Sequence, residues 1–290
     1  MKTSVVVINW NGAEKLKRYL PKILKVEGVD EFLVSDDASV DQSITVINSF
    51  PGVRLIKRDK NGGFSSNVNS GVSKAAGDLV FLLNPDAVPD TDCLIKALPY
   101  FKDPLLFSVG CNTGGNWSWA NFNKGFFWHY MKEGEPETHQ TLWARGGSGI
   151  FRKNIFDKLG GMDQFFDPYY EEDTDLGYRA TKRGYKNLWV KECKVVLPLE
   201  KGVIEENISM AKFSRIAQRN QLLFIWKNIT SEKLFSEHKM ALAKMLLINP
   251  KYWSVFLSAY KKWAEVQKKR EVEKKESKLT DEEILRMFDT

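Results

Sequence analysis

The sequence has few cysteines and histidines, and it lacks long apolar runs. None of the cysteines forms a C-x-x-C pair, so neither a disulfide framework nor a cysteine zinc site is expected, and a reducing compartment is favoured. The histidines share no metal-ligand spacing, so we expect surface or core residues. No charge-free apolar stretch approaches the length of a membrane span, and no cleavage site follows the first apolar run. We therefore predict neither a transmembrane helix nor a signal peptide.

Two common nucleotide-binding motifs are also missing. Gly62-Gly63 lacks the G-x-x-x-x-G-K-[ST] spacing, and no G-x-G-x-x-G follows the first predicted strand. These absences argue against a P-loop nucleotidase and a dinucleotide oxidoreductase. No repeat of fixed period is present, which argues against a solenoid.

The net charge of +6 over 290 residues is unevenly distributed. Residues 1–200 hold 25 basic and 25 acidic side chains, whereas residues 201–278 hold 17 basic and 8 acidic ones. The neutral first part argues against a nucleic-acid partner. For the basic segment two interpretations remain open: contact with a membrane surface, or packing between subunits or onto the rest of the chain.

Short apolar runs alternate with helical patterns through the first hundred residues. We predict strands at 5–8, 32–34, 53–56 and 79–83, and helices at 14–24, 41–50 and 65–76, the second with Asp41 as N-cap. This alternation predicts an α/β fold with a parallel sheet between helices. Residues 112–143 look irregular and aromatic. Helices are expected at 209–227, 231–247 and 251–269, then a capping box at Thr280 and Glu283.

Carboxylates follow the predicted strands, where such sheets bind ligands. Asp36 and Asp37 follow one strand, Asp86 follows another, and acidic residues 171–175 open a later helix. Acidic groups gathered at one sheet edge favour a hard cation with oxygen ligands. The alternative for each aspartate taken alone is a helix or turn cap.

Five motifs occur in a recognisable order. They are residues 5–12 (VVVINWNG), 35–41 (SDDASVD), 61–64 (NGGF) with Asn69 and Gly71, 82–86 (LLNPD), and 160–163 (GGMD) running to 172–175 (EDTD) and Arg179. With Arg219-Asn220 in a later helix, the match spans about residues 3–228. The chain therefore resembles the family 2 glycosyltransferases, in their rhamnosyltransferase-like branch of bacterial surface-polysaccharide biosynthesis.

The resemblance implies a GT-A fold and an inverting, metal-dependent glycosyltransferase. The donor would be a UDP-, dTDP- or GDP-linked sugar, the acceptor a hydroxyl of a saccharide or lipid-linked saccharide, and the cofactor Mn²⁺ or Mg²⁺. Residues 1–228 would form the catalytic domain, with a donor half at 1–110 and an acceptor half at 111–228. Outside the resemblance, the composition indicates a basic helical extension at residues 229–290, whose residues 229–270 are the candidate for peripheral membrane contact or homo-oligomerisation.

The resemblance also assigns roles to individual residues. Asp173 would be the general base and Asp86 the metal ligand. The donor would contact Asn9, Asn11, Asp36, Asn61, Gly63 and Asn84. Apart from the resemblance, we expect the acceptor to contact Trp117, Trp119, Gly147 and Glu172, although the tryptophans of the aromatic segment could equally form a satellite core.

Two positions depart from the family pattern. Asn84 replaces the first aspartate of a D-x-D motif, and the histidine that relatives carry after the last core strand is missing. Either Glu200 or Lys201 would replace that histidine, or the metal would be held more weakly. The competing functions are a non-catalytic nucleotide-sugar binder and a membrane-surface module built on the basic helices. The expected location is the cytoplasm, with the inner face of the cell membrane as the alternative.

Overall fold

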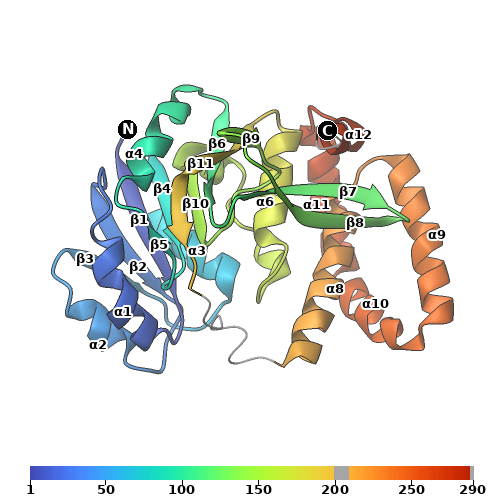
Figure 1. Cartoon of the computed structure of the whole chain (residues 1–290). Helices are drawn as coiled ribbons and strands as arrows, with labels where there is room; N and C mark the ends of the chain where they lie inside the picture. Colours follow the sequence, from blue (N-terminus) through green and yellow to red (C-terminus); the bar gives the residue numbers. More distant parts are fainter. Residues whose placement is uncertain (199–208, 288–290) are drawn as a thin grey trace.

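The computed structural model describes residues 1–198 and 209–287, and its centre is a nine-stranded mixed sheet (Figure 1). The strand order is β3-β2-β1-β4-β10-β6-β11-β5, with β9 paired to β11. Strands β1 to β4 pair in parallel, whereas β10 runs antiparallel to both β4 and β6. The strands are β1 (Thr3–Asn9), β2 (Glu31–Asp36), β3 (Val53–Lys57), β4 (Leu79–Leu83), β5 (Val88–Pro89), β6 (Leu106–Asn112), β9 (Thr138–Gln140), β10 (Ser148–Arg152) and β11 (Lys186–Val196).

Helices cover both faces of this sheet, as the alternating pattern predicted. The first half contains α1 (Ala13–Ile23), α2 (Ser43–Asn48), α3 (Phe64–Lys74), α4 (Cys93–Ala97) and η1 (Leu98–Lys102), and the second α5 (Lys153–Lys158), η2 (Gln164–Phe166) and α6 (Glu172–Lys182). Helix α2 begins at Ser43, later than predicted. Asp41 is not its N-cap residue, but its carboxylate accepts the Ser43 N–H and, from α1, the Ala13 N–H.

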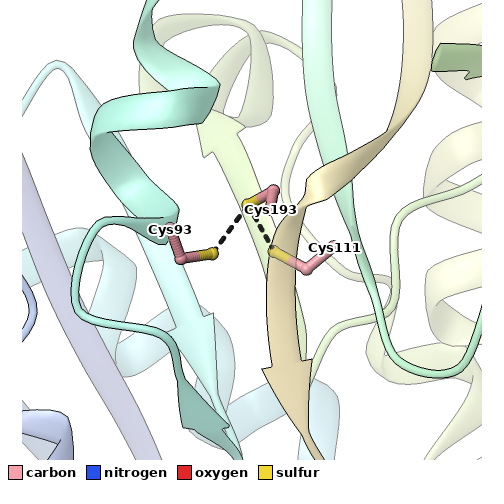
Figure 2. Close-up of side chains that lie close together, drawn as sticks. All are labelled: Cys93, Cys111 and Cys193. Carbon is pink, nitrogen blue, oxygen red and sulfur yellow. Dashed lines mark hydrogen bonds between the residues drawn. The ribbon is translucent and has the colours of Figure 1, made fainter. Parts of the chain in front are cut away.

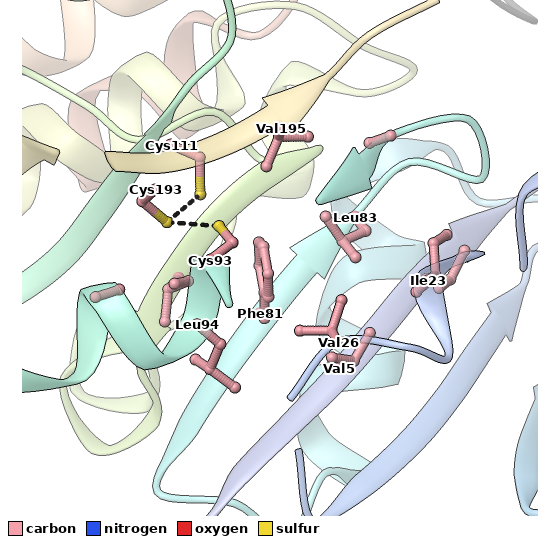
Figure 3. Packing of buried hydrophobic residues seen from close by; sticks show 14 of the residues in the cluster. Val5, Ile23, Val26, Phe81, Leu83, Cys93, Leu94, Cys111, Cys193 and Val195 are labelled. Atoms are coloured by element: carbon pink, nitrogen blue, oxygen red, sulfur yellow. Dashed lines mark hydrogen bonds between the residues drawn. The ribbon is translucent and has the colours of Figure 1, made fainter. Parts of the chain in front are cut away.

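Two apolar cores hold the helices on the sheet. One face of the strands packs Val5, Phe81 and Leu83 against α1 and α4, as Figure 3 shows. The other face packs Val6 and Leu82 against α3, α5 and α6. Central strands β1 and β4 are buried on both faces, so their functional polar groups are confined to the strand ends, whereas the edge strand β3 is partly exposed.

Residues 112–143 are more regular than the sequence indicated. Strands β7 (Asn116–Asn123) and β8 (Phe126–Glu133) form an antiparallel hairpin. Its two-residue turn places Lys124 at φ 51° and Gly125 at φ 77°, and two positive φ values suit the right-handed twist of a hairpin. The alternation was hidden because aromatic side chains occupy both faces of the hairpin.

The C-terminal helices share a third core with this hairpin. They are α8 (Met210–Asn228), α9 (Glu232–Ile248), η3 (Pro250–Tyr252), α10 (Trp253–Tyr260), α11 (Trp263–Glu276) and α12 (Asp281–Arg286). Phe127 of β8, Tyr178 of α6, Phe224 of α8, Val266 of α11 and Ile284 of α12 belong to one buried cluster. Residues 229–287 therefore pack onto the rest of the chain, which was one of the interpretations that the sequence left open. The predicted capping box is confirmed, since Thr280 and Glu283 cap α12 reciprocally.

No helix in the described part of the chain is long and apolar enough to cross a membrane.

Candidate active site

A hydrogen-bond network joins the ends of β1 and β2. The Asp36 carboxylate accepts from Asn9 Nδ2 at 2.7 Å and from Ser39 Oγ at 2.6 Å. Ser39 Oγ also accepts the backbone N–H of Asn11, which has φ 48°. Asp36 and Asn9 are fully buried, yet Asn9 Oδ1 has no hydrogen-bond partner. Contact of Asp36, Asn9 and Asn11 with the nucleobase of the donor stays a prediction. The hydrogen-bond network holds the backbone at these residues in one position.

Asp37 has a different task, which the sequence did not indicate. Its carboxylate accepts the N–H groups of Gly62 at 3.1 Å and Gly63 at 2.9 Å, and pairs with Arg58 at 3.2 Å. Burial raises the pKa of Asp37, opposed by these hydrogen bonds and by Arg58. The same loop is tightened by the Asn61 side chain, which accepts from Gly63 N. Asp37 thus clamps the loop that contains the predicted donor residues Asn61 and Gly63.

The end of β4 contains Asn84 and Asp86. Asn84 N donates to Gly147 O at 2.9 Å, and a Cβ on Gly147 would lie 2.6 Å from Asn84 Oδ1. Only glycine therefore lets the loop before β10 approach Asn84 this closely. The Asp86 carboxylate pairs with Lys15 of α1 at 2.8 Å. Sequence reasoning missed Lys15, because only the fold brings α1 beside the end of β4.

The same loop also contacts the predicted catalytic residue. Gly146 N donates to Asp173 Oδ2 at 3.4 Å, and Thr174 N donates to Asp173 Oδ1 at 2.8 Å. Two consecutive glycines therefore connect Asp173, at the start of α6, with Asn84, at the end of β4. The structure brings together the predicted base, Asn84 and Gly147 although they are distant in sequence.

Three consecutive acidic residues crowd the start of α6. Burial raises the pKa of Asp173, and burial together with Asp173 raises that of Glu172 well above its usual range. Glu172 Oε2 and Glu171 Oε2 lack hydrogen-bond partners. Helix-terminal N–H groups favour negative charge here, but the side chains repel one another. Glu172 and Asp173 therefore hold their protons more tightly than exposed carboxyls do, as the raised pKa of each indicates.

A strained loop presents these carboxylates. Tyr170 and Glu171 adopt φ values of 81° and 79°, which is uncommon for residues with side chains. Asn220 of α8 holds the loop, because its side-chain amide donates to the carbonyls of Tyr169 at 3.0 Å and Tyr170 at 2.9 Å. Arg219 donates to Asp167 O at 2.8 Å. Arg219-Asn220, part of the sequence match, thus serves to shape the loop before α6.

Asp175 lies behind the site and anchors α6. It is fully buried and pairs with Arg179 at 2.7 Å and Lys227 of α8 at 2.6 Å. Despite burial, these cations hold the pKa of Asp175 below its usual value. Asp175 is therefore a structural residue that fixes α6 on α8.

His129 is a site residue that sequence reasoning missed. Its Nε2 lies 3.1 Å from Glu171 Oε1, and its ring lies 5.6 Å from that of Tyr170. Burial would lower the pKa of His129, but Glu171 and Asp173 outweigh burial and raise it. Without a metal-ligand spacing around it, nothing in the sequence indicated that β8 would carry His129 to these carboxylates.

The predicted acceptor residues Trp117 and Trp119 lie on the other face of the hairpin. Cross-strand partners share a face, and His129 pairs with Ala120, whereas Trp119 pairs with Tyr130. Trp117 is buried and stacks on His139 at 4.2 Å between ring centroids. Contact of either tryptophan with an acceptor stays a prediction. Glu172 and Gly147, the other predicted acceptor residues, lie beside Asp173 and Asn84.

The strand-end acids do not form a cluster of metal ligands. In the described ranges, the one group of three or more potential ligands with mutually close atoms is Cys93, Cys111 and Cys193. Asp86 offers a single carboxylate beside Asn84. This donor set still fits Mg²⁺ or Mn²⁺, which in nucleotide sites commonly take one or two carboxylates together with phosphate oxygens and water. Glu200 and Lys201 lie outside the described residues.

The three cysteines, far apart in sequence, meet in the core between α4, β6 and β11 (Figure 2). Cys193 Sγ lies 2.7 Å from Cys93 Sγ and 3.2 Å from Cys111 Sγ. Hydrogen bonds from Cys111 and Cys193 lower the pKa of Cys93 to about 5, whereas burial raises those of the other two. Structural zinc sites have four ligands, and within residues 1–198 and 209–287 no fourth joins this cluster. We interpret the thiols as core residues.

Comparisons with known proteins identify the fold and the family. The model for "Glycosyl transferase family 2" matches residues 4–160. An N-acetylglucosaminyl-diphospho-decaprenol L-rhamnosyltransferase of Mycobacterium tuberculosis is 24% identical over 230 residues, covering 66% of this chain and 74% of the relative. The low-salt glycan biosynthesis hexosyltransferase Agl10 of Haloferax volcanii is 22% identical, and the alignment covers 67% of this chain and 65% of the relative.

Solved structures show the same fold. GalNAc-T7, crystallised with UDP, GalNAc and Mn²⁺, aligns with a TM-score of 0.65 at 14% identity, over 87% of this chain and 57% of that one. Residues 1–349 of TarS from S. aureus, in complex with UDP-GlcNAc, align with a TM-score of 0.60 at 14% identity, over 89% and 79%. The predicted GT-A fold with a helical C-terminal region is confirmed.

Proposed function

Because the chain belongs to glycosyl transferase family 2, as the sequence resemblance implied, we propose an inverting transfer of a sugar from a nucleotide-diphosphate sugar to an acceptor hydroxyl. The acceptor class we propose is a saccharide or lipid-linked saccharide, in line with the M. tuberculosis relative, whose name specifies a lipid-linked sugar. Asp173 would act as general base and Asp86 as metal ligand. The family match ends before Asp173, so the role of Asp173 rests on its geometry.

The observation that carries this proposal is the Gly146-Gly147 bridge. It connects Asp173, through Gly146 N, with the backbone of Asn84, through Gly147 O. A base and a donor-binding strand end held by adjacent glycines can position an acceptor hydroxyl in line with the donor's anomeric carbon. Such positioning supplies a large part of the rate in a displacement reaction.

The reaction balances with one base. The acceptor oxygen forms a bond to the anomeric carbon, its proton passes to an Asp173 carboxylate oxygen, and the anomeric carbon–oxygen bond breaks toward the nucleoside diphosphate. The pKa of Asp173, raised by burial, brings the carboxylate closer to the pH at which a base works best. The positive charge of His129 and Arg145 near Asp173 counteracts that rise and favours the ionised form.

A metal at Asp86 would neutralise the diphosphate and improve it as a leaving group. Lys15, which pairs with Asp86, lies where it can contribute positive charge to the same phosphates. We expect Mn²⁺ or Mg²⁺ to tighten donor binding in the wild type and to leave donor binding by Asp86→Asn unchanged. Titrating donor with and without metal measures both. Full transfer in the presence of a chelator would contradict the metal assignment.

The general base is tested by Asp173→Asn. Loss of the base should lower kcat by about 10²–10⁴-fold, because general-base catalysis supplies an effect of that size, while the donor dissociation constant stays unchanged. Asp157→Asn, at an exposed carboxylate on α5, is the matched control and should keep the wild-type kcat. Wild-type turnover by Asp173→Asn would refute the assignment.

A further inference from the structure

Helices α9 and α10, which follow each other across η3, expose large apolar side chains that the described part of the chain does not cover. We define this surface, the apolar tip, by its six members. Their exposed fractions are 68% for Met240, 84% for Leu247, 68% for Ile248, 45% for Trp253, 50% for Leu257 and 51% for Tyr260. Exposed apolar side chains that gather on two consecutive helices, rather than being scattered singly, indicate an interaction site.

The side chains of the apolar tip are not the ones with which α9 and α10 pack onto the rest of the protein. Helix α9 buries Leu234, His238 and Leu242, and α10 buries Val255 and Ala259 in the core shared with α8. Each helix is thus apolar on an inner face and also on part of its outer face. A helix that is apolar on two faces is normally covered on both.

The segment from His238 to Ala264, which contains the tip, has basic side chains and no acidic ones. No aspartate or glutamate occurs between Glu237 and Glu265, whereas this interval contains five lysines. Four of the five, Lys239, Lys244, Lys251 and Lys261, are exposed. A basic rim around exposed leucine and tryptophan complements a surface that is negative outside and apolar inside.

The aromatic side chains of the tip are held in place by the fold. Trp253 Nε1 donates to Leu246 O at 3.0 Å, and the rings of Tyr260 and Phe256 stack at 5.6 Å. Tryptophan and tyrosine are the residues that favour the headgroup level of a bilayer, and lysine stems extend to the phosphates there. The tip therefore presents an interfacial anchor that needs little ordering.

We propose that the apolar tip docks this protein on a bilayer surface rich in anionic lipid, with Leu247, Ile248 and Leu257 entering the headgroup boundary. In Figure 1 the α9–α10 turn lies on the lower side of the molecule, toward which β11 and the strands parallel to it also run. The tip and the carboxyl ends of these strands therefore face one side. This docking goes beyond the proposed function and does not depend on it.

Vesicle co-sedimentation of the full chain, without donor or acceptor, tests the proposal. We expect binding to vesicles of phosphatidylglycerol and phosphatidylcholine and much weaker binding to phosphatidylcholine alone. Lys244→Gln, Lys251→Gln and Lys261→Gln together should lower the partition coefficient roughly 100-fold. Leu247→Ser with Leu257→Ser should lower it at least about tenfold.

Matched variants control for fold and general charge. Lys17→Gln, Lys25→Gln and Lys74→Gln remove three exposed lysines elsewhere. Ile95→Ser with Leu105→Ser removes two apolar side chains that are 45% and 46% exposed, close to the exposure of Leu257. These controls should bind at or near the wild-type level, and all variants should melt like the wild type.

Three results would overturn the proposal: absence of vesicle binding by the wild type, equal losses in tip and control variants, or a dimer in light scattering that Leu247→Ser with Leu257→Ser converts to a monomer. The last would assign the tip to a second copy of the chain.

Discussion

Asp281 ties the C-terminal helix α12 to α6, and its replacement by alanine tests whether residues 229–287 belong to the catalytic domain. Its carboxylate is fully buried and accepts from Lys182 at 2.9 Å, the Tyr178 hydroxyl at 2.7 Å, and the N–H groups of Thr230 at 2.6 Å and Ser231 at 2.7 Å. Asp281→Ala leaves these donors without their acceptor.

The size of the effect follows from the burial of both partners. Lys182 is also fully buried, and removing one partner of a buried ion pair costs about 3–5 kcal/mol. Burial lowers the pKa of Lys182, so the orphaned amine can lose its proton, which limits the cost. Each kcal/mol lowers Tm of a chain of this size by about 2–4 °C, so we expect a drop of roughly 6–20 °C.

Thermal melts and urea titrations of full-length protein measure this loss. Asp157→Ala is the matched control, because Asp157 pairs with Lys153 at the surface with half of its side chain exposed, and such a pair contributes about 0–1 kcal/mol. Lys182→Met combined with Asp281→Leu should recover only the part of the loss that comes from the orphaned Lys182, because the Tyr178 hydroxyl and the N–H groups of Thr230 and Ser231 still lack an acceptor. A loss by Asp281→Ala no larger than that by Asp157→Ala would refute the docking of α12 on α6.

Three further predictions concern the site and the core. Glu172→Gln should stabilise the protein by about 1–3 kcal/mol at pH 8 and hardly at pH 4. The pKa of Glu172 is raised in the folded protein, so the stability of the wild type falls as the pH rises through that pKa. Urea titrations at both pH values measure the difference. Gly147→Ala should displace Asn84 and weaken donor binding in a titration, whereas Gly110→Ala, whose Cβ has ordinary contacts, should not. The buried thiols should react with a water-soluble disulfide reagent only after unfolding; rapid labelling of native protein would contradict their burial.

The sequence indicated the site through residues that follow strands. Asn84 and Asp86 were identified because parallel strands bring their carboxyl ends to one edge, a consequence of local pattern alone. Asp173 was identified from the motif that opens α6. Its contact with Gly146, and through Gly147 with Asn84, could not be predicted, because a contact between the start of α6 and the loop before β10 depends on how these elements pack.

The unpredicted members of the site come from distant elements. His129 reaches Glu171 because β8 folds back on β7, and Lys15 reaches Asp86 because α1 packs beside the end of β4. Neither residue belongs to a local pattern. In each case the role of the side chain depends on one contact between residues that are distant in the sequence. A single sequence contains no periodic pattern that would indicate such a contact.

By itself, the sequence determined the alternation of strands and helices in the first hundred residues, the C-terminal helices, the family, and the placement of acids after strands, because periodicity and local motifs encode these directly. The tertiary structure decided which of those acids hold secondary-structure elements together and which line the candidate active site. It turned Asp36 and Asp175 into hydrogen-bonded supports and raised the pKa of Asp173. It also decided that the basic C-terminal helices complete a core, since burial and pairing depend on neighbours supplied by the whole fold.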